Sequence, residues 1–206
     1  MPLWKLHLHR QYPDSQSYRV LIGLVAIAAS ALLTILGGKI GLVGSKVIAE
    51  LAIAACLLWF FVEPNGAPFT SKLTAALIFS GAAIGVAWIA FIAPSRPEGG
   101  FIDWKTHPFV FLLIGYVGAT ITAPLFEEKV VRGMIFHGLS KYVSPLVSSI
   151  LVSILFALAH SENMLWAFAV SIVLCWMMLK YGLNTYQRAI VHGSINFVIM
   201  TWYLLN

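Results

Sequence analysis

Four ionisable residues lie within one long apolar stretch of the chain: Glu127, Glu128, Lys129 and Arg132. On an α-helix, residues four positions apart lie about 40° from each other around the axis, so Glu128 and Arg132 share a face and are expected to pair. Glu127 lies about 100° from Glu128 and points into a different space. One carboxylate therefore has a counter-ion built into the same helix, whereas its neighbour remains available to accept a proton.

Two further pairs of residues repeat the four-residue spacing. His192 and Asn196 share a helix face, and together they offer adjacent N–H donors suited to the oxyanion of a tetrahedral intermediate. Phe156 precedes His160 by one turn, so that the aromatic ring can pack against a substrate or fix the imidazole. Each pair alone is typical of ordinary buried side chains, but the three together on long apolar segments indicate a functional site.

The composition is that of a membrane protein. Of the 206 residues, 60% are hydrophobic and 10% are charged, and the mean hydropathy is +0.87. Soluble domains carry about 25% charged residues, so this chain must face lipid. The formal charge of +5 does not indicate nucleic-acid binding, because Lys and Arg lie at the ends of apolar segments, where membrane-flanking cations are found.

The apolar runs predict an all-α polytopic protein with about seven transmembrane helices around an intramembrane polar cavity. The expected spans are about 19–38, 46–63, 72–93, 108–140, 144–161, 164–181 and 186–205. We expect a single membrane domain over residues 1–206, with a polar N-terminal head at 1–18 and the motif-bearing half at about 108–206.

The distribution of cations predicts a cytoplasmic N-terminus, through the excess of Lys and Arg on the cytoplasmic side of membrane proteins. The inner set would be Lys5, Arg10, Arg19, Lys72, Lys141, Lys180 and Arg188, against an outer set of Lys39, Lys46, Arg96 and Lys105.

The fourth span poses a geometric problem, because as one helix it would be about 50 Å long, more than the ~30 Å of the hydrocarbon core. Pro124 is expected to kink it just before the two glutamates. Straight, upright helices would separate Glu127, His160 and His192 by ~10 Å or more along the membrane normal. Tilt or shifted span boundaries must bring them together.

At these residues the chain resembles the CPBP family of membrane proteins, which includes type II CAAX prenyl endopeptidases and bacteriocin-processing or immunity (Abi-type) proteins. The family pattern is EExxxR, then FxxxH, then HxxxN. Here it reads Glu127-Glu128 to Arg132, Phe156 to His160, and His192 to Asn196, in order and in full. The resemblance covers about 109–203, and the first three spans carry no motif.

The resemblance implies a role for each residue of the motifs. Glu127 would be the general base that activates a water molecule, and His160 would help to position that water. His192 and Asn196 would hold the developing oxyanion, while Glu128, Arg132 and Phe156 would shape the site. The implied reaction is peptide-bond hydrolysis in a membrane-bound or lipidated substrate, such as a prenylated CAAX protein.

Three alternatives remain open from the sequence. Two His and one Glu could bind zinc, although the chain lacks the H-E-x-x-H helix of many zinc peptidases, and the resemblance favours a metal-free mechanism without any cofactor. A non-enzymatic binder, such as an immunity protein, would use the same cavity to hold a peptide. A transporter or proton relay would also bury Glu and His, but the chain lacks the two related halves common in transporters. The expected partners are membrane lipids and a membrane-associated peptide, without nucleic acid.

Overall fold

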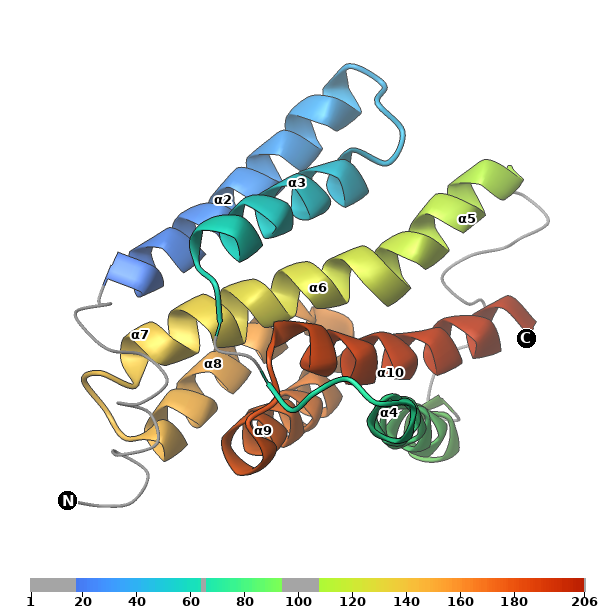
Figure 1. Cartoon of the computed structure of the whole chain (residues 1–206). Helices are drawn as coiled ribbons and strands as arrows, with labels where there is room; N and C mark the ends of the chain where they lie inside the picture. The colour runs from blue at the N-terminus through green and yellow to red at the C-terminus, as the bar shows by residue number, and fades with distance from the viewer. Residues whose placement is uncertain (1–17, 64–65, 94–107, 206) are drawn as a thin grey trace.

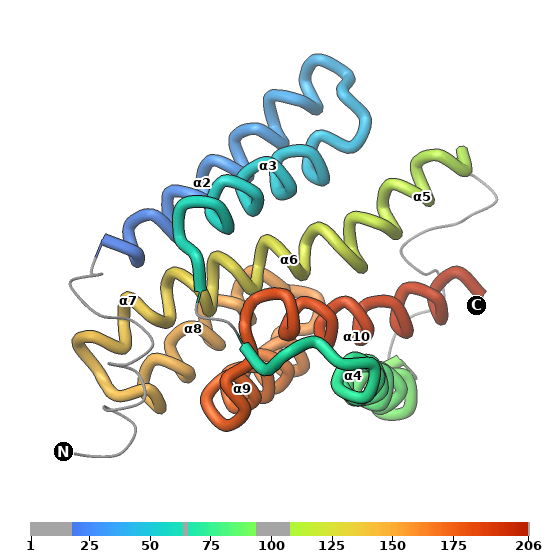
Figure 2. Tube along the Cα trace, in the orientation of Figure 1, coloured from blue at the N-terminus to red at the C-terminus, as the bar shows by residue number. Residues whose placement is uncertain are grey.

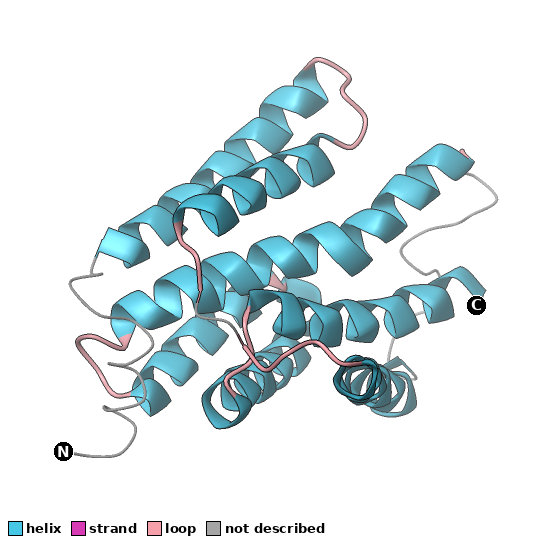
Figure 3. Ribbon diagram, in the orientation of Figure 1, coloured by secondary structure: helices cyan, strands magenta, loops and turns pink. Residues whose placement is uncertain are grey.

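The structure is a computed structural model that describes residues 18–63, 66–93 and 108–205, and all of its regular elements are helices within these ranges (Figure 3). Helix α2 (Tyr18–Lys39) and helix α3 (Ser45–Phe60) form an antiparallel hairpin (Figure 1). Gly41 and Gly44 turn the chain between them with φ angles of 73° and 76°, which glycine adopts without strain. The predicted polar head lies outside the described residues.

One long helical segment crosses the molecule beneath this hairpin and carries the two glutamates (Figure 1). We call it the motif helix. It consists in chain order of α5 (Phe109–Val117), η2 (Gly118–Thr122), α6 (Ala123–Glu127), η3 (Glu128–Phe136) and α7 (His137–Leu139). The other elements are α4 (Ser71–Phe91), α8 (Pro145–Ala159), the 3-10 turn η4 (Ser161–Asn163), α9 (Met164–Tyr181) and α10 (Thr185–Leu205).

Two parts of the motif helix, η2 and η3, are π-helical. The hydrogen bonds of a π-helix run from residue i to i+5, so that one turn takes more residues than in an α-helix, and residues four apart become more nearly aligned. This geometry stacks Glu128 over Arg132 more closely than an α-helix would. The sequence predicts a kink at Pro124, and in the structure the π-helical segment η2 ends two residues before this proline.

Helix α10 begins with a reciprocal cap that fixes its direction. The backbone N–H of Gln187 donates to Asn184 Oδ1 at 3.0 Å, and the Asn184 N–H donates to Gln187 Oε1 at 3.1 Å. This exchange satisfies two N–H groups at the helix start, as a capping box does. The Gln187 amide also donates to the Ala67 carbonyl at 2.6 Å, which ties the chain before α4 to the start of α10.

Glycines allow α10 to approach its neighbours closely. A Cβ atom at Gly81 would lie 2.3 Å from the Val191 carbonyl oxygen, and one at Gly85 would lie 2.8 Å from Val198 Cβ. This four-residue glycine spacing is typical of tightly packed membrane helices. On the opposite side, a Cβ atom at Gly193 would lie 2.3 Å from the Thr120 carbonyl oxygen. Helix α10 is thus held between α4 and the motif helix (Figure 2).

The predicted spans agree with the helices in number and place. Four helical segments are long and apolar enough to cross a membrane: Tyr18–Lys39, Ser71–Phe91, Phe109–Leu139 and Ser161–Tyr181. The apolar helix Pro145–Ala159 is shorter. The count of seven spans and the cytoplasmic N-terminus therefore stay predictions.

The close approach at Gly81 gives a first test. Gly81→Ala should destabilise the protein by about 1–3 kcal/mol, because the added methyl group meets backbone that cannot move aside. Gly115→Ala is the matched control: this helical glycine has open space around it, so alanine should stabilise by about 0.5–1 kcal/mol. Thermal unfolding in detergent micelles measures both, and equal effects of the two variants would contradict the packing described here.

Candidate active site

The two adjacent glutamates lie in different surroundings, although they are neighbours in the chain. The Glu128 side chain is fully buried, whereas the Glu127 side chain is 20% exposed. All nine residues of η3, from Glu128 to Phe136, are buried. The difference in direction that helix geometry predicts for the two carboxylates is therefore present.

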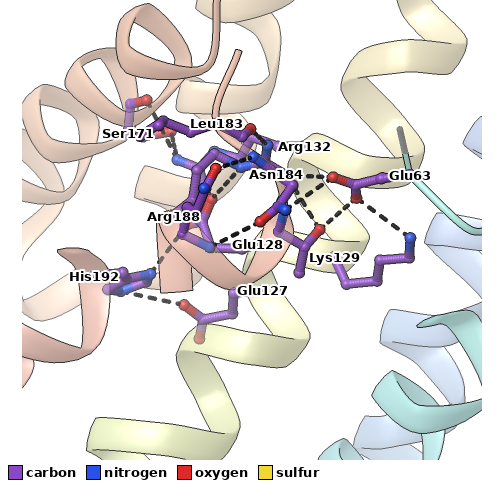
Figure 4. Close-up of polar contacts among 12 residues, drawn as sticks. Glu63, Glu127, Glu128, Lys129, Arg132, Ser171, Leu183, Asn184, Arg188 and His192 are labelled. Carbon is purple, nitrogen blue, oxygen red and sulfur yellow. Dashed lines mark hydrogen bonds and ion pairs between the residues drawn. The ribbon is translucent and has the colours of Figure 1, made fainter. Parts of the chain in front are cut away.

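Glu128 is held by three nitrogen donors (Figure 4). Its Oε1 lies 3.0 Å from Arg132 Nη1 and 3.1 Å from His192 Nδ1, and its Oε2 lies 3.3 Å from Arg188 Nε. The pair of Glu128 and Arg132, expected from their spacing, is present. A buried carboxylate costs several kcal/mol unless it is paired and hydrogen-bonded, and here both of its oxygens have cationic partners.

Arg132 is itself fixed by contacts on two sides. Its Nη2 donates to Ser171 Oγ at 2.5 Å and to the Ser171 carbonyl at 3.3 Å, which connects the motif helix to α9. Its guanidinium carbon lies 4.9 Å from the centroid of the Phe156 ring, a cation–π contact from α8. Glu128 therefore faces a cation with little freedom to move.

Glu127 has a different environment. Among the described residues its partner within ion-pair distance is His192, whose Nε2 lies 3.7 Å from Glu127 Oε2 (Figure 4). This distance is too long for a direct hydrogen bond and leaves room for a water molecule to take part. A carboxylate can only accept a hydrogen bond, so His192 Nδ1 carries a proton and donates it to Glu128. The other ring nitrogen of His192, Nε2, faces Glu127.

Phe156 brings the remaining histidine to the cluster. The His160 ring stacks on it at a centroid distance of 4.3 Å, and the His192 ring meets it edge-on at 5.7 Å. His160 Nδ1 lies 2.8 Å from the Phe156 carbonyl oxygen. One aromatic ring thus contacts Arg132, His160 and His192, which come from three different helical segments.

Asn196 lies one turn beyond His192 on α10. Its Nδ2 donates to the carbonyl oxygen of Ala119, in the π-helical segment η2, at 2.8 Å. One of the two amide hydrogens is used in this bond, and the other remains for a ligand. The structure therefore places Asn196 beside the motif helix, at the segment that precedes Pro124.

A second buried polar cluster, which was not predicted from the sequence, lies next to this site. We call it the loop network, and it consists of three charged residues and one threonine: Glu63, Lys129, Arg188 and Thr185. Glu63 Oε1 lies 3.3 Å from Lys129 Nζ, and Glu63 Oε2 lies 3.3 Å from Arg188 Nη2. Burial raises the pKa of Glu63, but the adjacent Arg188 and Lys129 outweigh it and lower the pKa to about 2.

The structure corrects the prediction for two cations that were expected to flank the membrane. Arg188 is 1% exposed and Arg19 is 5% exposed. Arg19 donates to the Gly133 carbonyl at 3.3 Å, and Arg188 takes part in the loop network. The signal for Arg188 was in the sequence, because it precedes His192 by four residues and must share its helix face.

The described residues contain no group of three or more His, Cys, Asp or Glu side chains placed to hold a metal ion. Two of the three residues suggested as zinc ligands, Glu127 and His192, do approach each other. The contacts of His160 are with Phe156. The residues present thus do not fit a zinc site in this arrangement.

Comparison with known proteins adds one finding. Residues 107–198 match the family described as Rce1-like, type II CAAX prenyl endopeptidase. A search of curated proteins and a search of solved structures gave no significant match. The matched segment contains every residue of the three motifs, and with the long apolar helices it makes the chain an integral membrane protein. The match over residues 107–198 supports assignment to the CPBP/CAAX protease family.

Proposed function

We propose that the chain is an intramembrane endopeptidase in which Glu127 activates a water molecule for attack on a peptide bond of a membrane-associated substrate. The observation that carries the proposal is the contrast between the two glutamates. Glu128 has two arginines and a histidine as partners, whereas Glu127 is partly exposed and faces His192 at 3.7 Å. A carboxylate without a paired arginine or lysine is suited to take and release a proton.

The proposed reaction uses the site without a metal or an organic cofactor. Glu127 removes a proton from water, and the oxygen of that water attacks the carbonyl carbon of the scissile bond. Asn196 donates its second amide N–H to the oxyanion that forms, and His192 donates to it through Nε2 in the form that carries a proton on both ring nitrogens. When the C–N bond breaks, the proton held by Glu127 passes to the leaving nitrogen. His160, ordered by Phe156, positions the attacking water.

An apolar groove beside this site supports a substrate that carries a lipid. It has a volume of about 1000 Å³ and lies between α4, the motif helix and α10. Its lining includes Ala82, Tyr116, Leu125, Ile190 and Phe197. Leu125 and the groove residue Gly193 are close in sequence to Glu127 and His192, so an apolar group in the groove would place an attached peptide near the carboxylate. A prenyl group on a CAAX-type peptide has this chemistry.

The role of Glu127 is tested by comparing Glu127→Gln with Glu128→Gln on a prenylated peptide. Glu127→Gln should lower kcat by about 100-fold or more with the thermal unfolding temperature unchanged, because Glu127 forms no pair with Arg or Lys. Glu128→Gln should lower both kcat and stability, since it weakens three buried contacts. Full activity of Glu127→Gln would contradict the mechanism, and peptide binding without any cleavage by the wild type would favour an immunity-type binder.

Metal independence is tested by exhaustive chelation. Activity should survive incubation with EDTA and 1,10-phenanthroline followed by dialysis, because the proposed water is activated by a carboxylate. Added zinc should then produce no increase in rate. Loss of activity that zinc restores would show that the metal-dependent alternative is correct.

The groove is tested by narrowing it. Ala82→Phe should raise the KM for a prenylated peptide about tenfold, equivalent to ~1.4 kcal/mol of lost binding, because the new ring occupies the lipid site. Ala83→Phe is the matched control, since Ala83 is exposed on the same helix and does not line the groove. An equal KM for the two variants would show that the groove does not bind the lipid.

A further inference from the structure

The connection between α3 and α4 reaches the start of α10 through one buried carboxylate. The Glu63 side chain is 6% exposed, and its Oε2 accepts the Thr185 backbone N–H at 2.9 Å. Thr185 is the first residue of α10, so Glu63 lies at the positive end of that helix, where an anion is stabilised. A residue from outside the three motifs thus fixes the helix that carries His192.

Arg188 connects this carboxylate to the candidate active site (Figure 4). Its Nη2 lies 3.3 Å from Glu63 Oε2, and its Nε lies 3.3 Å from Glu128 Oε2. It also donates to Thr185 Oγ1 at 3.2 Å and to the Leu183 carbonyl. Because a guanidinium is planar and rigid, it fixes the two carboxylates relative to each other.

The two oxygens of Glu128 are held by different partners. Oε1 accepts from both Arg132 and His192, whereas the partner of Oε2 among the described residues is Arg188. The terminal torsion of a glutamate is broad, so a carboxylate held at one oxygen can rotate. Because Arg188 also holds Oε2, the plane of the carboxylate is fixed. The direction of Oε1 is then fixed too, and with it the orientation of the His192 ring that donates to Oε1.

We propose that Arg188 is a positioning residue for His192, that it acts through Glu128, and that Glu63 acts by holding Arg188. The α3–α4 connection then contributes to the geometry of a site whose motifs all lie in residues 107–198. The kinetic part of this proposal rests on the proposed peptidase function.

The test compares two buried cations that share a partner. Arg188 and Lys129 each lie 3.3 Å from an oxygen of Glu63, but the cation that also contacts Glu128 is Arg188. Arg188→Met should lower kcat about 100-fold, the cost of a misplacement of about 1 Å in an active site, with KM within about threefold of the wild type. Lys129→Met should lower the unfolding temperature and leave kcat within about threefold. Equal losses of kcat in both variants would overturn the proposal.

Two further variants separate geometry from charge and from general stability. Arg188→Lys keeps the positive charge but cannot bind both carboxylates with one planar group, so its kcat should also fall, by about tenfold or more. Full activity of Arg188→Lys would show that charge alone suffices. Glu63→Gln should lower kcat in the wild type and have no additional effect in Arg188→Met. Multiplicative losses would show that Glu63 does not act through Arg188.

A spectroscopic measurement tests positioning without any activity. In protein labelled with ¹⁵N-histidine, the Nδ1 resonance of His192, assigned by its loss in His192→Gln, should shift in Arg188→Met and Arg188→Lys and stay in place in Lys129→Met.

If no peptide is cleaved by the wild type but these shifts occur, the proposed function fails and the positioning stands. If the wild type cleaves peptide and neither kcat nor the resonance changes in the Arg188 variants, the positioning is wrong. Arg188→Lys serves for both measurements if Arg188→Met does not fold.

Discussion

The structure depends on the requirement that a fully buried carboxylate be neutralised. Glu128 has no exposed surface, and its two oxygens are satisfied by three donors that come from the motif helix and α10. Removing one partner from such a group is costly, typically 3–5 kcal/mol, because it leaves a charge uncompensated. The positions of Arg132, Arg188 and His192 therefore follow from the burial of this one side chain, as does the close contact between the two helical segments.

The neutralisation of Glu128 also determines what its neighbour can do. The arginines nearest the two glutamates are engaged: Arg132 with Glu128 and Ser171, and Arg188 with Glu128 and Glu63. Glu127 consequently faces His192 alone within ion-pair distance among the described residues. The difference between a fully paired and a partly exposed carboxylate thus arises from helix geometry, which points two adjacent side chains into different surroundings.

Much of this arrangement was predictable from local spacing, and the rest depends on contacts between residues that are far apart in the sequence. Four-residue intervals predict the pair of Glu128 and Arg132 and the shared face of His192 and Asn196, because both are properties of a single helix. The link between Glu63 and Arg188 joins residues 125 positions apart and has no local periodicity. The π-helical segments could not be predicted either, because no sequence pattern distinguishes them from an α-helix.

The glycine contacts of α10 have a consequence for biosynthesis. The partner of α4 in close packing begins at Thr185, long after α4 itself ends at Phe91. During translation α4 enters the membrane before the surface that Gly81 and Gly85 are shaped to receive has been made. Assembly of α4 is therefore a late event, and it coincides with the arrival of His192 beside Glu127. A chain arrested before α10 would hold both glutamates without His192, so the candidate site is completed only when the last helix has packed.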